Sequence, residues 1–332
     1  MGTQSGRSDP GPGPANDLTD VPGLHVGCAQ DERVRTGVSV VLPAKAAVCA
    51  ADVRGGGPGT RETDALRLEG LVDRADAIVL SGGSVYGLAA ADAVTAALGA
   101  RGRGFALVSQ ERVPVSPIVP AAILYDLANG GAKDWRDRPP YVGLAQEALA
   151  ALGWPVPQGR AGAGCGAAAG AHPGGQGSAS WREAGVTVAA LAAVNSFGSP
   201  YVPGTDRFWA APYEQGGEFG GRGAAAAVGV AGLPPDTKSG TSPEAGTNTT
   251  LAVIATDAAL TKPQAKRLAV MAQDGLSRAI RPVHGPTDGD VVFALATGEG
   301  APIDLLELLR LGTIAGDVLA RAVARGVHAA EG

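Results

Sequence analysis

The chain has 332 residues, 45% of them hydrophobic but only 4% aromatic, so its core has to consist mainly of alanine and aliphatic side chains. Its 27 basic and 32 acidic residues give a formal charge of −5, and no basic tract indicates a nucleic acid or a membrane surface as a partner. The three cysteines have no CxxC spacing, so we expect a cytoplasmic protein without structural disulfides.

The first half of the chain is expected to alternate strands and helices after a polar tail. Residues 1–16 are rich in glycine and proline and contain no apolar stretch typical of a secretion signal, which predicts a disordered tail. Apolar runs and helical periodicity then predict strands over 36–43, 46–54 and 76–83 and a helix over 85–102. Three prolines within 113–127 predict an extended edge or loop before a short helix.

The second half is expected to continue this alternation around two loops. The glycine-rich residues 159–180 predict a loop before a strand over 186–196, and residues 197–247 predict an exposed loop or linker. Further strands and helices, the first helix capped by Thr261, are predicted over 251–257, 261–280, 291–297 and 303–325. Because no internal repeat interrupts this pattern, the sequence predicts a single mixed α/β domain over residues 17–332.

Common catalytic and cofactor motifs are absent or weak. No serine has the spacing of a GxSxG nucleophile elbow, no histidine begins an HExxH motif, and no lysine follows a glycine as in a Walker A loop. Residues 164–169 match the dinucleotide fingerprint only loosely, without a clear preceding strand. The aspartate pair within 287–290 is a weak metal-ligand set, since Asp-Gly is first a turn signal. We therefore expect neither a metal nor an organic cofactor.

An unusual polar tripeptide, Asn248-Thr249-Thr250, stands directly before the apolar run of the strand predicted at 251–257. In one interpretation the threonines are β-formers that begin the strand. In another, Asn248 is a turn residue, because asparagine tolerates a left-handed backbone. In a third, the tripeptide is an N-glycosylation sequon, which has no meaning in a chain that is not secreted. On the residues alone, the start of a strand is favoured over catalysis.

A fourth interpretation makes Thr249 a catalytic residue. If the chain were cleaved between Asn248 and Thr249, the new α-amine would lie within reach of the Oγ1 atom of the same residue. The pKa of an α-amine is about 8, so a useful fraction is neutral and can accept a proton at physiological pH. Nucleophile and base would then belong to one residue, held rigidly by the strand behind it.

Six collinear blocks carry a resemblance to a known family: TDVPGLHVG, DVRGGGPGTRETD, IVLSGGSVYGL, GRAGAGCGAAAG, NTTLAVIATDAAL and HGPTDGDVVFALATG. The chain resembles the L-aminopeptidase/D-esterases and β-aminopeptidases that mature by self-cleavage, and among them most the nylon-oligomer (6-aminohexanoate oligomer) hydrolase branch. This resemblance implies a four-layer αββα sandwich of the aminopeptidase/ornithine-acetyltransferase-like type. It also implies two associated fragments, 17–248 and 249–332, in a homo-oligomer, a dimer or tetramer of processed heterodimers.

The resemblance also assigns roles to the matching positions of this chain. It makes Thr249 the nucleophile, freed by cleavage after Asn248. Asp288 and Asp290 match an acidic or hydroxyl pair that faces the nucleophile and can steer proton transfer. Asn195 matches a position that polarises the scissile carbonyl, for which an amide N–H is a suitable donor.

Other positions concern the substrate and one departure from the family. Tyr86 matches a pocket tyrosine, and Gly82 and Gly83 would allow the backbone to approach a bound peptide closely. The family commonly has a lysine after the loop that corresponds to GAAAG. This chain has Ala171 there, followed by His172, so the supporting cation is missing or replaced.

The sequence thus predicts a self-processing N-terminal-threonine amidohydrolase that cleaves small peptides or oligoamides through an acyl-enzyme on Thr249. Two alternatives stay open. An exo-acting aminopeptidase, with D-esterase or β-aminopeptidase activity, would require a free amine on its substrate. A catalytically impaired homologue that only binds small amides or peptides is supported by the departure at Ala171.

Overall fold

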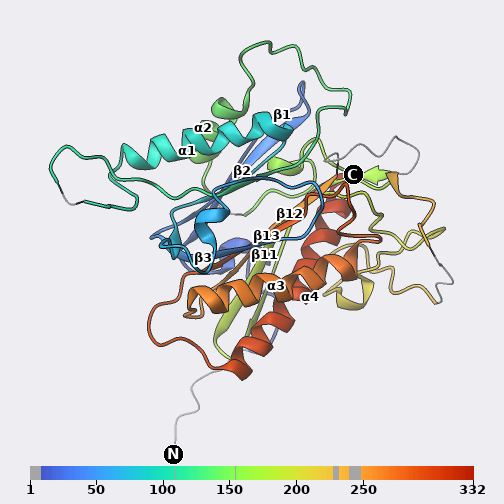
Figure 1. The fold of residues 1–332 in the computed structure, drawn as a ribbon. Coiled ribbons are helices and arrows are strands. Elements are labelled where there is room, and N and C mark those ends of the chain that lie inside the picture. The colour runs from blue at the N-terminus through green and yellow to red at the C-terminus, as the bar shows by residue number, and fades with distance from the viewer. Residues whose placement is uncertain (1–8, 109, 154, 227–231, 239–247) are drawn as a thin grey trace, which may run out of the picture.

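The structure, a computed structural model, describes residues 9–332 apart from residues 109, 154, 227–231 and 239–247. Two β-sheets are stacked face to face between two pairs of helices, which confirms the predicted αββα sandwich (Figure 1). The first sheet contains, in spatial order, β1 (Leu24–Asp31), β2 (Thr36–Pro43), β6 (Ile78–Ser81), β7 (Ala121–Ile123) and β4 (Gly59–Arg61).

The second sheet carries the strand that begins with the polar tripeptide. Its spatial order is β10 (Gly175–Glu183), β11 (Val186–Asn195), β12 (Thr249–Thr256), β13 (Val291–Ala296), β3 (Ala47–Val53) and β5 (Arg74–Ala75). Strand β12 is antiparallel to β11 and parallel to β13, so it lies in the interior of the sheet with neighbours on both sides. A short pair, β8 (Ala168–Ala169) and β9 (His172–Pro173), stands apart.

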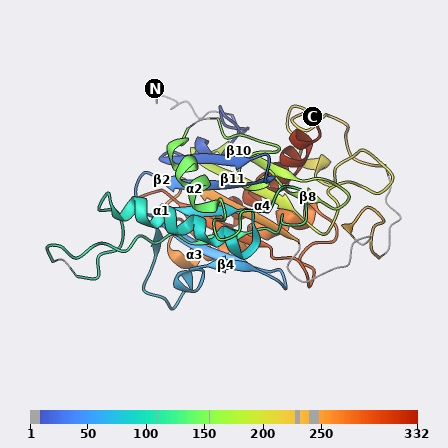
Figure 2. The ribbon, with the colours of Figure 1, turned by 90° about the horizontal axis from the view of Figure 1, so that it is seen from above.

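The helices cover the outer faces of the two sheets. On the first sheet lie α1 (Ala90–Gly99) and α2 (Tyr141–Ala150), and on the second lie α3 (Lys262–Ala279) and α4 (Leu305–Ala330). The predicted cap of α3 is confirmed, because the Thr261 side chain accepts the Gln264 N–H in a capping box. The predicted helix over 85–102 begins instead as a 3-10 segment, η3 (Ser84–Ala89). Seen from above, the described part of the segment between α1 and β7 projects from the body (Figure 2).

The hydrophobic core forms three layers, as the four-layer architecture requires. Alternate residues of β12 face opposite layers: Leu251 and Val253 point between the two sheets, whereas Ala252 and Ile254 point toward α3 and α4. Because both faces of the strand are covered, all eight of its residues are buried. The N-terminal residue of this strand, Thr249, is thereby held in a rigid frame.

The predicted loop over 159–180 is partly wrong, since β10 begins at Gly175. Glycine serves close packing here: a Cβ atom on Gly177 would lie 2.1 Å from the Ala322 carbonyl oxygen on α4. The sequence suggested a loop because glycine is also a turn former, and the contact that requires it comes from a residue far along the chain.

Two further expectations about loops need correction. The segment 197–247 is not an exposed linker in its described part, because Tyr201, Phe208 and Phe219 are buried in the core layer beneath α4. Residues 1–8 of the predicted disordered tail lie outside the described residues, but within the rest of it Gly11 and Arg182 exchange backbone hydrogen bonds of 3.0 and 2.7 Å. Within the described residues, no helix is long and apolar enough to cross a membrane.

The glycine contact between β10 and α4 leads to a stability prediction. We expect Gly326→Ala to destabilise the protein by about 1–3 kcal/mol, the usual cost of overpacking, because its Cβ would lie 2.6 Å from the Gly177 backbone nitrogen. Gly312→Ala is the matched control on the same helix, since the nearest atoms to its Cβ would be the Cε and Sδ atoms at the flexible end of Met271, and no backbone atom is among them. Urea unfolding of the two variants checks this, and equal midpoints would contradict it.

Candidate active site

The start of β12 brings the predicted nucleophile beside its predicted partners. Thr249 is 2% exposed and lies directly opposite Asn195, the last residue of β11, in the antiparallel register. The preceding residue, Asn248, forms a parallel bridge with Asp288 in the loop before β13. Five predicted residues, Asn195, Asn248, Thr249, Asp288 and Asp290, are therefore gathered at the ends of three adjacent strands.

The carbonyl group before Thr249 is held between two hydrogen-bond donors. Its oxygen, the Asn248 carbonyl oxygen, accepts a hydrogen bond from the Thr249 hydroxyl. It also accepts the Gly289 backbone N–H at 2.8 Å. An N–H aimed at a carbonyl oxygen stabilises the negative charge that develops there when a nucleophile adds to the carbonyl carbon. The hydroxyl and the polarising donor therefore both stand at the peptide bond that the sequence predicts to be cleaved.

A glycine is required at position 289 for this arrangement. A Cβ atom there would lie 2.7 Å from Thr249 Oγ1 and 2.8 Å from the Gly57 carbonyl oxygen. The turn that the sequence predicts at Asp288-Gly289 thus also brings the backbone close to the nucleophile, which only glycine permits.

Asp288 is buried and its carboxylate is hydrogen-bonded to main-chain donors. Its Oδ1 atom accepts the Phe197 N–H at 3.2 Å and its Oδ2 atom accepts the Gly285 N–H at 2.7 Å. Burial, with a smaller contribution from the charge of Asp290, raises the pKa of Asp288 to about 6, although the backbone donors and Lys238 oppose this. A carboxyl with this pKa changes its protonation state near neutral pH, as proton transfer in a hydrolase requires.

Asp290 anchors the residue that follows the nucleophile. Its Oδ1 atom accepts the Thr250 N–H at 2.7 Å. Its Oδ2 atom accepts the backbone N–H of His284 at 3.1 Å and lies 2.7 Å from the Nδ1 atom of the same residue. The carboxylate side chain is 1% exposed, so these contacts take the place of water around a buried charge.

A lysine without a predicted role, Lys238, completes the cluster. The Nζ atom of Lys238 donates to the Asn195 carbonyl oxygen at 3.1 Å and to the Asn195 Oδ1 atom at 3.2 Å. Burial lowers the pKa of Lys238 to about 7, while the negative charge of Asp288 acts in the opposite direction. The Asn195 Nδ2 group donates to the Tyr125 carbonyl oxygen at 2.9 Å, so the orientation of this amide is fixed from both ends.

The segment that carries Lys238 packs on the loop where the family commonly has its lysine. The Ala171 N–H donates to the Asp236 carbonyl oxygen at 2.8 Å, and the Lys238 N–H donates to the Phe197 carbonyl oxygen at 3.1 Å. His172 lies 3.8 Å from Asp236 in the same contact region. The lysine of this site is therefore Lys238, which stands on the segment packed against that loop. The only sequence signal was a single lysine within the glycine- and proline-rich residues 197–247.

The three residues predicted to bind substrate belong to the other sheet. Gly82 and Gly83 follow β6, and the Gly83 N–H donates to the Asp126 Oδ1 atom at 2.8 Å. Added Cβ atoms would meet Asp126 at Gly82 and the Tyr141 ring at Gly83, so both glycines are required for packing. Tyr86 is 47% exposed, with its ring 5.9 Å from that of Trp135.

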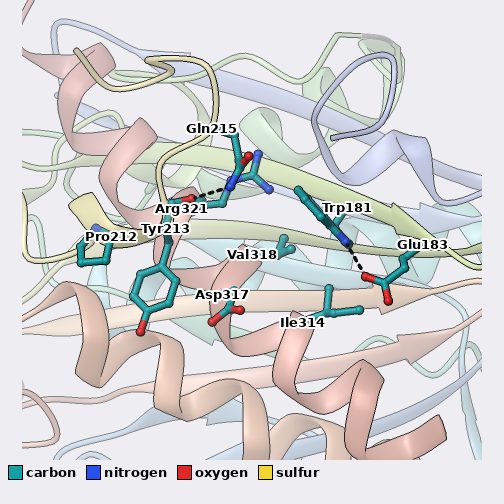
Figure 3. A pocket seen from close by; sticks show the side chains of 9 residues that line it. All are labelled: Trp181, Glu183, Pro212, Tyr213, Gln215, Ile314, Asp317, Val318 and Arg321. Carbon is teal, nitrogen blue, oxygen red and sulfur yellow. Dashed lines mark hydrogen bonds between the residues drawn. The ribbon is translucent and has the colours of Figure 1, made fainter. Parts of the chain in front are cut away.

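A separate hollow lies at the end of the six-stranded sheet opposite to Thr249. Figure 3 shows the side chains that line it. The hollow has a volume of about 290 Å³ and is lined by β10, α4 and the η5 segment (Ala211–Tyr213), including Trp181 and Tyr213. Trp181 pairs with Val188 and Val188 with Thr256, seven residues along β12 from Thr249. At about 3.3 Å per residue this is roughly 23 Å, so the hollow is not part of the Thr249 cluster.

Comparisons with known proteins identify the family of the chain. The model of peptidase family S58 matches residues 16–332. The chain belongs to peptidase family S58. This S58 chain is 44% identical over 332 residues to an uncharacterized aminopeptidase of Mycobacterium tuberculosis, covering 94% of the chain and 93% of that protein. It is 30% identical over 299 residues to a 6-aminohexanoate-oligomer endohydrolase of Kocuria sp., covering 84% and 74% respectively.

The fold of the S58 chain is similar to that of a solved structure. The L-aminopeptidase D-Ala-esterase/amidase from Ochrobactrum anthropi, described as a new variant among the Ntn hydrolase fold, aligns with a TM-score of 0.70. The alignment covers 95% of this chain and 86% of that chain at 22% sequence identity. The resemblance deduced from the sequence is confirmed, and the S58 chain is an amide-bond hydrolase with an N-terminal-nucleophile type of fold.

Proposed function

We propose that this S58 hydrolase cleaves its own chain between Asn248 and Thr249 and then uses the new N-terminal threonine to hydrolyse small peptides or oligoamides. The observation that supports this most directly is the Asn248 carbonyl oxygen, which faces both the Thr249 hydroxyl and the Gly289 N–H. In the first step Thr249 Oγ1 adds to the Asn248 carbonyl carbon and the C–N bond breaks. The Asn248 acyl group then sits as an ester on Oγ1, and the α-amine of Thr249 is free.

Water completes the processing by hydrolysing the ester. This releases the Asn248 carboxylate and restores the Thr249 hydroxyl, now next to its own α-amine. The initial proton of the hydroxyl needs a different acceptor, because the α-amine does not exist before the cut. Lys238 and Asp288 both have a pKa close to neutral. We assign this role to the neutral amine of Lys238, which contacts Asn195, the residue directly opposite Thr249. The proton that the amine takes from the hydroxyl then passes to the Thr249 nitrogen as the C–N bond breaks.

The two fragments should remain associated after the cut. The small fragment, 249–332, contributes β12, β13, α3 and α4, and these strands lie between β11 and β3 of the large fragment. Separation would break backbone ladders on both sides and expose two core layers. We also propose further assembly into a homo-oligomer of processed heterodimers, which light scattering of the processed protein tests.

Intact-mass spectrometry of the purified protein tests the proposal. It should show an 84-residue fragment beginning at Thr249 together with the larger fragment. A single full-length mass of 32.9 kDa, stable on prolonged incubation, would favour the impaired, binding-only alternative instead.

The substrate class is tested on the processed enzyme with matched pairs of amides. Small peptides and oligoamides with a free amino terminus are compared with the same compounds after N-acetylation. The 44%-identical relative is named an aminopeptidase and the 30%-identical one an oligomer endohydrolase, so both modes have a counterpart among the relatives. Loss of turnover on acetylation would select the exo-acting mode, and unchanged turnover the endo-acting mode.

A further inference from the structure

His284 is a histidine of the active-site loop to which neither the sequence nor the family comparison assigns a role. Both its backbone N–H and its ring Nδ1 atom contact the Oδ2 atom of Asp290, at 3.1 and 2.7 Å. An ionised carboxylate only accepts hydrogen bonds, so the ring nitrogen that faces it has to carry the proton. The contact therefore fixes the ring in a state with a proton on Nδ1.

The Oδ1 atom of Asp290 connects the contact with His284 to the nucleophile. Asp290 Oδ1 accepts the N–H of Thr250, the residue directly after the nucleophile. His284 and Thr250 thus hold the two ends of one buried carboxylate. If the His284 ring were lost, Oδ2 would keep only the backbone donor of residue 284, and the carboxylate would be free to rotate away from the Thr250 N–H.

The backbone of His284 has an unusual conformation. Its φ angle is +57°, a left-handed value that non-glycine residues adopt infrequently and at a cost in free energy. Such a conformation persists where the surrounding contacts determine it. Here the main chain and the side chain of one residue bind the same carboxylate oxygen, which is such a determining contact.

The far side of the ring is also buried. The Nε2 atom of His284 is inaccessible and has no hydrogen-bond partner among the described residues. This leaves Nδ1 as the ring atom with an identified role, and it allows the contributions of the two nitrogens to be separated by substitution.

We propose that His284 is a positioning residue that holds the Asp290 carboxylate through Nδ1–H and thereby fixes Thr249 against the carbonyl it attacks. Thr250 N–H, Asp290 and the His284 ring form one chain of hydrogen bonds that begins at the residue after the nucleophile. A misplaced nucleophile loses rate because the distance between the reacting atoms grows. The expected change in processing rate rests on the proposed self-cleavage. The positioning of the Thr250 N–H by Asp290 and His284 does not depend on it.

Three substitutions at position 284 separate the possible roles. Asparagine places an N–H donor close to the position of Nδ1 and tolerates a positive φ angle, whereas glycine tolerates the same backbone without offering a side chain. Glutamine reaches toward the position of Nε2 instead. We expect His284→Asn to process at a rate within a fewfold of the unaltered protein, and His284→Gly and His284→Gln to process at least about tenfold more slowly.

Processing is measured from the appearance of the fragment that begins at Thr249. Hydrogen exchange of the segment 249–256, performed in a Thr249→Ala background, gives a second readout that needs no cleavage. In that background the Thr250 N–H should exchange faster with His284→Gly than with His284→Asn. Wild-type-like processing and exchange in His284→Gly would overturn the proposal, as would recovery by glutamine but not by asparagine. If the unaltered protein never cleaves, the proposed function fails while the exchange measurement still decides the role of His284.

Discussion

Thr249→Ala is expected to remain a single chain of full length and to hydrolyse no amide substrate. The substitution removes the hydroxyl that contacts the Asn248 carbonyl oxygen, and with it the only proposed nucleophile for both processing and turnover. The fold should persist, because Thr249 is one residue at the end of a strand whose other positions supply its packing. Intact mass and a hydrolysis assay on the same sample measure the two losses together.

Thr249→Ser is the matched control for this variant. It keeps the hydroxyl but loses the methyl group that restricts χ1, so processing should continue at a reduced rate. If Thr249→Ala still yields two fragments with the same junction, another group attacks the Asn248 carbonyl and the assignment of Thr249 is wrong.

The residues that surround Thr249 could be predicted from the sequence because they belong to short, continuous motifs. Asp288 and Asp290 lie in one loop and Asn195 ends an apolar run, so the family resemblance transfers to them position by position. The structure adds why these motifs converge, since β11, β12 and β13 are neighbours and their ends meet. The four-layer architecture was likewise implied by the resemblance and not by periodicity.

Lys238 and the strand β10 could not be predicted for a common physical reason. Each depends on a contact between residues far apart in the chain, and neither leaves a local pattern. Lys238 reaches the site because its segment pairs with Ala171 and Phe197. The glycines of β10 fit because α4 packs directly against them, which only the tertiary structure reveals.

Lys238→Met is expected to slow processing by roughly 10²–10⁴-fold, the usual contribution of a general base. Methionine has a similar length and removes the amine that contacts Asn195. Lys238→Arg distinguishes two possible roles of Lys238, a proton acceptor and a permanent positive charge, since a guanidinium keeps its proton at all relevant pH values. If the neutral amine is required, the arginine variant should be as slow as the methionine variant. Near-normal processing with arginine would mean that positive charge alone suffices.

The pH dependence of processing tests the same assignment with a defined sign. The pKa of Lys238 is lowered to about 7, so its neutral fraction, and with it the processing rate, should rise as the pH passes through about 7. The negative charge of Asp288 raises the pKa of Lys238, and Asp288→Asn removes that charge. The midpoint of the pH profile should therefore move to lower pH in this variant, even if its maximal rate is reduced. Single-turnover processing rates between pH 5 and 9 measure the shift, and a midpoint that stays fixed or moves upward would show that another group titrates.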